Sequence, residues 1–316
     1  MIDSLQGSFQ NKIARIAADE EHYNSLKQAD FDVLDQYLRG SLARPKSKIN
    51  KGPRFKKWES TLTNALNSLV FYELNLLQLE LFRSRRWNTV QASNCFSISF
   101  IASQALQYSL ERYPIRFNGR KNLGFHPGDL CFIAFGLIIG AREEAMKFFQ
   151  TFQLSKAEGW YNSISERDVH HRLERLILLS VEADQSDLAN VSEIPKFAQD
   201  MMSNDVDKIR ASLKNACDNH LHECAREYAV DAPVDQNNPK KGAEDFGAFS
   251  NGFWMNIPLE YLLIKTVRTR AGMDTPSIEH FLVREVFDSQ LPQTGFHLEP
   301  PYDKVLKKMK SQGFRF

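Results

Sequence analysis

The chain of 316 residues is 42% hydrophobic, which is enough to bury one large core or two ordinary ones. A net charge of +1 excludes a strong overall attraction to nucleic acid or to an anionic membrane surface. Only 15 Gly and 12 Pro are present, and this scarcity of turn-forming residues favours long helices over many short strands.

The first 57 residues combine two predicted helices with a basic loop. Apolar spacing predicts amphipathic helices over residues 2–21 and 30–38, and Gly40 ends the second. Residues 44–57 contain seven Lys and Arg, two Pro and no acid, so we interpret them as a basic surface loop. The chain starts with polar and acidic residues and not with the apolar segment of a secretory signal, which predicts a cytoplasmic protein.

Two long helices are predicted next. Leucines spaced three to four residues apart indicate a helix over residues 58–83. Residues 90–112 indicate another helix with a face of small side chains, which permits close packing. This face is formed by Ala92, Ser99 and Ser103.

The most apolar part of the chain predicts a central buried helix. Pro127 suits a first-turn position, and we expect one helix from there to Phe152 with apolar side chains on all its faces. Gly136 and Gly140 lie four residues apart on one face and would let a neighbouring helix approach closely. The apolar run is too short to cross a bilayer, so no membrane span is expected.

The second half of the chain predicts two more groups of helices. Helices are expected over residues 165–181 and 194–202, followed by a long helix that Asp205 caps and that ends near Tyr228. Beyond a polar segment, further helices are expected over residues 258–270, 278–287 and 302–310. The sequence therefore predicts an all-α fold, a single large domain of about nine to eleven helices. Within it, a core of residues 1–235 carries a C-terminal helical module of residues 236–316.

Four potential metal ligands lie close together in the sequence, namely Cys217, His220, His222 and Cys224. On an unbroken helix, a rise of about 1.5 Å per residue places the two cysteines about 10 Å apart along the axis. Two Zn–S bonds of about 2.3 Å cannot close that gap. We therefore predict an ordinary helix with no bound metal or other cofactor, and a zinc site remains the alternative if the helix is broken.

Two other pairs suggest acid–base or nuclease chemistry. His170 and Glu174 lie one helical turn apart, which suits an acid–base pair, although an exposed helical pair is the more common meaning. Arg15 and His22 have the Arg-x4-6-His spacing and resemble helical HEPN-type ribonucleases, but Ile16 replaces the polar residue that often follows the Arg. Phosphate-binding, dinucleotide-binding, serine-hydrolase and zinc-protease motifs are absent, so the sequence predicts a protein without catalysis of its own.

Charge is unevenly distributed along the chain. Residues 44–121 contain 14 Lys and Arg against four Asp and Glu, whereas residues 182–235 contain 12 Asp and Glu against five Lys and Arg. These regions are either solvated faces of a balanced protein or partner surfaces of opposite sign. Phe55 within the basic loop and Trp58 just after it would also suit stacking on nucleic acid.

The C-terminal part of the chain carries its most distinctive string. It reads NGFWMNIPLEYLLIKTVRTRAGMDTPSIEHFLVREVF from Asn251, followed by Leu291-Pro292 and by YDKVL from Tyr302. Residues 246–306 thereby resemble the all-helical immunity proteins of bacterial polymorphic-toxin and type VI secretion systems, in particular immunity protein family forty-nine. Those chains tend to close with an aromatic–Pro–acid helix start, a basic helix end, G-x-x-x-P and a short tail that contains Pro and Asp. The resemblance implies a cytoplasmic antitoxin that inhibits by occlusion.

The partner implied by this resemblance is a cognate toxin or effector domain, with no direct contact to nucleic acid or membrane. Many toxins that act on nucleic acid are basic, so we expect the toxin-facing residues in the acidic region. The candidate residues are Asp205, Asp207, Asp218, Glu223, Glu227, Asp231 and Asp235. The alternatives are a HEPN-like ribonuclease that uses Arg15 and His22, and a helical adaptor that binds nucleic acid or protein through the basic loop.

Overall fold

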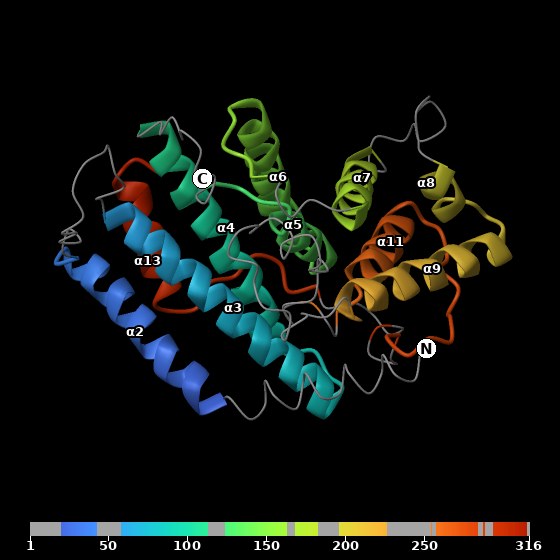
Figure 1. Cartoon of the computed structure of the whole chain (residues 1–316), viewed down its shortest axis with the longest axis horizontal. Helices are drawn as coiled ribbons and strands as arrows, with labels where there is room; N and C mark the ends of the chain where they lie inside the picture. The colour runs from blue at the N-terminus through green and yellow to red at the C-terminus, as the bar shows by residue number, and fades with distance from the viewer. Residues whose placement is uncertain are drawn as a thin grey trace, which may run out of the picture.

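All regular elements that the structure describes are α-helices. The computed structural model describes residues 20–42, 58–112, 124–162, 168–182, 196–225, 254, 257–283, 287 and 293–314. These residues form ten helices and a single isolated β-bridge between Phe125 and Tyr161, which confirms the predicted all-α fold. The helices form an elongated array, from α2 at one end to α8 and α9 at the other (Figure 1).

Three long helices form a layer at one end of the molecule. They are α2 (Glu20–Arg39), α3 (Trp58–Ser84) and α4 (Thr89–Arg112), with α3 between the other two (Figure 1). The bounds of α3 and α4 agree with the predicted helices to within one residue. The predicted break between residues 21 and 30 is wrong, because α2 is continuous from Glu20, and residues 2–19 lie outside the described part of the chain.

The central apolar segment forms two helices, so the prediction of one helix from Pro127 to Phe152 is wrong. The two are α5 (Asp129–Ile138) and α6 (Arg142–Ala157). Gly140 separates them with φ of +86°, a left-handed conformation that glycine adopts without strain. Nine of the ten α5 residues are buried, because α5 packs against α4, α6, α7 and α11 at the centre of the array.

The two glycines of this segment have different roles. A Cβ on Gly136 would lie 2.2 Å from the Phe96 ring of α4, so the absence of a side chain permits the predicted close approach of a neighbouring helix. Gly140 instead provides the turn between α5 and α6. The small-residue face of α4 is buried as expected, with Ala92, Ser99 and Ser103 all nearly inaccessible.

Four helices form the other end of the molecule. They are α7 (Asp168–Glu182), α8 (Lys196–Met201), α9 (Val206–Ala225) and α11 (Leu259–Arg270). Helix α11 contacts α5, α7 and α9, and therefore joins this group to the centre. Asp205 caps α9 as predicted, because its Oδ1 accepts the backbone N–H groups of Asp207 and Lys208 at 3.1 and 3.3 Å.

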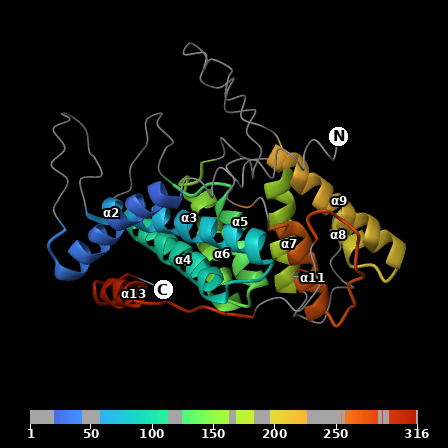
Figure 2. The same cartoon turned by 90° about the horizontal axis from the view of Figure 1, so that it is seen from below.

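The chain after α11 returns to the first layer. Residues 273–283 contain no helix, so the predicted helix from Ile278 is wrong over its described part, although Phe287 is helical. Helix α13 (Tyr302–Ser311) lies against α2 (Figure 2), where the Lys308 ammonium donates to the carbonyl oxygens of Tyr37 and Leu38 at 2.6 and 3.0 Å. No helix in the described ranges combines the length and the apolar character that crossing a bilayer needs.

Candidate functional site

The cysteine and histidine cluster on α9 is part of the core. Cys217, His220 and Cys224 are buried, whereas His222 is exposed. The Nε2 atom of His220 lies 3.1 Å from the carbonyl oxygen of Trp254, and burial raises the pKa of the Cys217 thiol well above its usual range. Within the described ranges, no three His, Cys, Asp or Glu side chains are grouped closely enough to bind a metal ion.

His170 and Glu174 on α7 do not form the exposed helical pair that their spacing more commonly means, because His170 is 3% exposed and the Glu174 side chain 16%. Both carboxylate oxygens of Glu174 accept hydrogen bonds from the Lys156 ammonium at 2.9 Å, and one also accepts from the Gln153 amide at 2.7 Å. His170 is buried. The candidate nuclease residues lie outside the described part of the structure, which does not include Arg15 or the side chain of His22.

The described acids of the predicted toxin-facing surface differ in their contacts and in their exposure to solvent. Asp205 caps α9, and Asp218 lies 3.1 Å from the Nε2 atom of His280. Asp207 projects into solvent with 96% of its side chain exposed, and Glu223 is partly buried. The remaining candidates, Glu227, Asp231 and Asp235, lie outside the described residues, as does the basic loop at 44–57.

Helix α9 is less acidic than its sequence region suggests. It also exposes three basic side chains, those of Lys208, Arg210 and Lys214. Lys208 lies 3.9 Å from the Asp205 carboxylate and Arg210 lies 4.0 Å from that of Asp207. The described part of the predicted surface is therefore of mixed charge, with Asp207 as its most accessible acid.

A buried ion pair joins α7 to α11. The carboxylate of Glu260 is 1% exposed, and its Oε1 accepts a 2.7 Å hydrogen bond from Nε of Arg172. Its Oε2 receives no hydrogen bond from the described residues. Burial raises the pKa of Glu260 above its usual range, and the neighbouring Arg172 partly offsets this increase. The sequence indicated only that Glu260 lies at the start of a helix.

The arginines at the end of α11 bind the ends of other segments. The Arg268 guanidinium, 2% exposed, donates to the carbonyl oxygens of Met201, Ser203 and Asp274 at distances of 2.6–3.1 Å. Arg270 donates to the carbonyl oxygen of Leu137 on α5 at 3.3 Å. Carbonyl groups at helix ends have no partner within their own helix, so these arginines satisfy them and fix α5 and α8 against α11.

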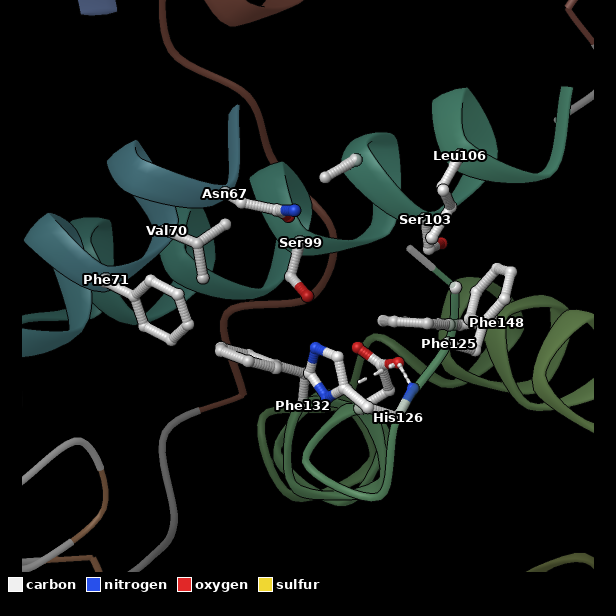
Figure 3. A pocket seen from close by; sticks show the side chains of 13 residues that line it. Asn67, Val70, Phe71, Ser99, Ser103, Leu106, Phe125, His126, Phe132 and Phe148 are labelled. Atoms are coloured by element: carbon white, nitrogen blue, oxygen red, sulfur yellow. Dashed lines mark hydrogen bonds and ion pairs between the residues drawn. The ribbon is translucent and has the colours of Figure 1, made fainter. Parts of the chain in front are cut away.

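Sequence reasoning missed a small pocket between the first layer and the centre of the molecule. Its cavity volume is about 70 Å³, and α3, α4, α5 and α6 contribute to its walls together with residues 124–126 (Figure 3). Four phenyl rings line it, those of Phe71, Phe125, Phe132 and Phe148. Its polar lining residues are Asn67, Ser99, Ser103, His126 and Asp129.

Backbone contacts hold one wall of this pocket in place. The Phe125 N–H donates to the Trp160 carbonyl oxygen at 3.0 Å, and the Phe125 carbonyl oxygen accepts from Asn162 N–H at 2.8 Å. A Cβ on Gly124 would lie 2.1 Å from the Trp160 carbonyl oxygen, so only glycine permits this approach. The only sequence feature that relates to this pocket is the small-residue face of α4, and such a face does not by itself indicate a pocket.

Comparisons with known proteins give no relative on which to base an assignment. No known protein family matches this chain, and neither a curated protein nor a solved structure does. The resemblance of residues 246–306 to an immunity family therefore stays a prediction.

Proposed function

We propose that the protein is a cytoplasmic immunity protein that binds a cognate toxin domain and neutralises it by occlusion, without chemistry of its own. The observation that carries the proposal concerns the residues of the resemblance. Glu260, Arg268 and Arg270 belong to the string that resembles the immunity family, and in the structure they join α11 to α5, α7 and α8. These residues of the string therefore form contacts that hold the helices together. We expect this role for residues that a family shares because of a common fold.

Such a framework suits inhibition by occlusion. Helix α9 packs on α8 and α11, and α11 is fixed by its buried charged side chains. A surface that is rigid before binding loses little conformational entropy when it binds, which favours tight complexes. Asp207 is the most accessible acid on the described part of this surface and is our choice for a contact with a basic toxin.

We expect the wild-type protein to protect bacterial cells from the C-terminal toxin domain encoded by the adjacent toxin gene. The Asp207→Lys variant should protect less and should associate with the toxin about three- to tenfold more slowly at low salt, because charge complementarity mainly sets association rates. The measurements are survival on co-expression and association kinetics at two salt concentrations.

The matched control is Glu143→Lys, which makes the same charge change on the exposed face of α6. This variant should behave as wild type. The lack of an adjacent toxin gene, or cell death despite expression of the wild-type protein, would contradict the proposed function. Equal slowing by the two variants would contradict only the assignment of Asp207 to the interface.

A further inference from the structure

The pocket between α3, α4, α5 and α6 combines aromatic walls with a partly buried carboxylate. Phe125, Phe132 and Phe148 are almost fully buried, and the Phe71 and Phe132 ring centroids are 6.3 Å apart. The Asp129 side chain is only 16% exposed. The Asp129 carboxylate favours a cation over an anion in this pocket, and a phenyl ring adds to this preference wherever the cation lies over its face.

The charge of Asp129 is only partly compensated by the described residues. Its Oδ2 accepts the backbone N–H of His126 at 2.8 Å and lies 3.9 Å from Nδ1 of the same residue. The imidazole of His126 is about half exposed to solvent. Burial raises the pKa of Asp129 above its usual range, which agrees with a carboxylate that has lost water and gained no strong cationic partner.

The size of the pocket limits what it admits. Its volume of about 70 Å³ is less than half of the roughly 150 Å³ of a cavity that binds benzene. The Ser99 side chain points toward His126 and Phe132 (Figure 3), so its hydroxyl offers a hydrogen-bond acceptor within the pocket. An ammonium group on a short alkyl chain is small enough for this volume and carries the positive charge that complements the carboxylate. Its N–H groups can donate hydrogen bonds to the carboxylate and to the Ser99 hydroxyl.

We propose that this pocket is a binding site for an alkylammonium group, held by the Asp129 carboxylate and the surrounding phenyl rings. The group belongs either to a free small amine or to a lysine side chain of a bound protein. The site does not depend on the proposed immunity function, and it is tested on the purified full-length chain alone.

The test is calorimetric titration of the protein with ethylammonium, with 1-propanol as the uncharged probe of similar size. We expect ethylammonium to bind, and 1-propanol to bind at least about tenfold more weakly, because only the ammonium can donate a charge-assisted hydrogen bond to the Asp129 carboxylate. Titration with butylammonium separates the two sources. Butylammonium binding as tight as that of ethylammonium shows that the pocket admits a stem as long as that of a lysine side chain, and weaker binding restricts the ligand to a free small amine.

Two variants test the residues of the site. Asp129→Asn removes the charge but keeps an oxygen that accepts the His126 N–H, and it should weaken ethylammonium binding at least about tenfold. Ser99→Leu keeps the charge and fills the cavity, so it should abolish binding. The matched control is Glu143→Gln, which removes an exposed carboxylate on α6 and should leave binding unchanged.

Circular dichroism and thermal melting confirm that each variant is folded before titration. If one variant does not fold, the other still tests the site. The absence of ethylammonium binding to the wild-type protein would overturn the proposal. Binding of 1-propanol as tight as that of ethylammonium, or binding unchanged in a folded Asp129→Asn or Ser99→Leu variant, would also overturn it.

Discussion

Replacing Phe135 with Asp is expected to prevent the protein from folding. Phe135 lies on the central helix α5, is fully buried and packs against Trp87 and Trp254, with ring centroids 6.2 and 5.4 Å away. Loss of a buried phenylalanine ring costs about 3–5 kcal/mol. An unpaired buried carboxylate adds several kcal/mol more, and the sum approaches the roughly 5–15 kcal/mol by which a domain is stable.

Circular dichroism and size-exclusion chromatography would test this expectation. We expect the Phe135→Asp variant to show no cooperative melting transition and to aggregate. The matched control is Leu154→Asp on α6, which introduces the same charge at a position that is 38% exposed. The control should fold and melt nearly as wild type. A soluble Phe135→Asp variant with a normal melting transition would show that α5 is not the centre of the core.

Replacing Arg172 with Ala is expected to destabilise the protein by about 3–5 kcal/mol at neutral pH. The substitution leaves the carboxylate of Glu260 buried without the Arg172 guanidinium, the one cation that pairs with it among the described residues. Replacement of the other partner, Glu260→Gln, should lower the free energy of unfolding much less, because Arg172 is partly exposed and retains contact with water. In the double variant, the uncharged glutamine should restore much of the stability that Arg172→Ala loses.

The loss of stability should depend on pH in a defined direction. The pKa of Glu260 in the folded protein lies above its ordinary value of 4.5, and removal of Arg172 raises this folded-state pKa further. Protonation removes the buried charge, so the difference in stability between wild type and variant should shrink as pH falls toward the ordinary value. Urea denaturation at several pH values measures this difference. A loss that stays constant or increases toward acidic pH would contradict the assigned role of Glu260.

The helices were predictable where local patterns determine them. Apolar spacing correctly indicated α3 and α4, and the short polar side chain of Asp205 correctly indicated the start of α9. The break at Gly140 has a local signal, a glycine followed by the acids Glu143 and Glu144 in the first turn of α6, but the continuous apolar run before it favoured a single helix. The helix expected from Ile278 does not form over its described part, where His280 makes contacts that its local pattern does not indicate. Its Nε2 lies near Asp218, and its Nδ1 accepts the Leu282 N–H.

The buried polar groups depend on contacts that no local pattern contains. Arg172 and Glu260 are 88 positions apart, and Met201 at the end of α8 and Ser203 just after it are more than 60 positions from Arg268. The pocket around Asp129 is formed by four helices and by the backbone of residues 124–126, so its lining residues are dispersed between Asn67 and Phe148. Sequence reasoning could name the side chains but not which of them meet.

The central claim is inhibition by occlusion, and titration of the purified toxin domain with the purified protein tests it most directly. We expect toxin activity to fall linearly with added protein and to reach zero near one equivalent. The masses of both chains should be unchanged, and full activity should return when the complex is dissociated. Complete loss of toxin activity at a small fraction of one equivalent, or a changed toxin mass, would show that the protein acts as an enzyme. Full toxin activity in the presence of excess protein would contradict the claim altogether.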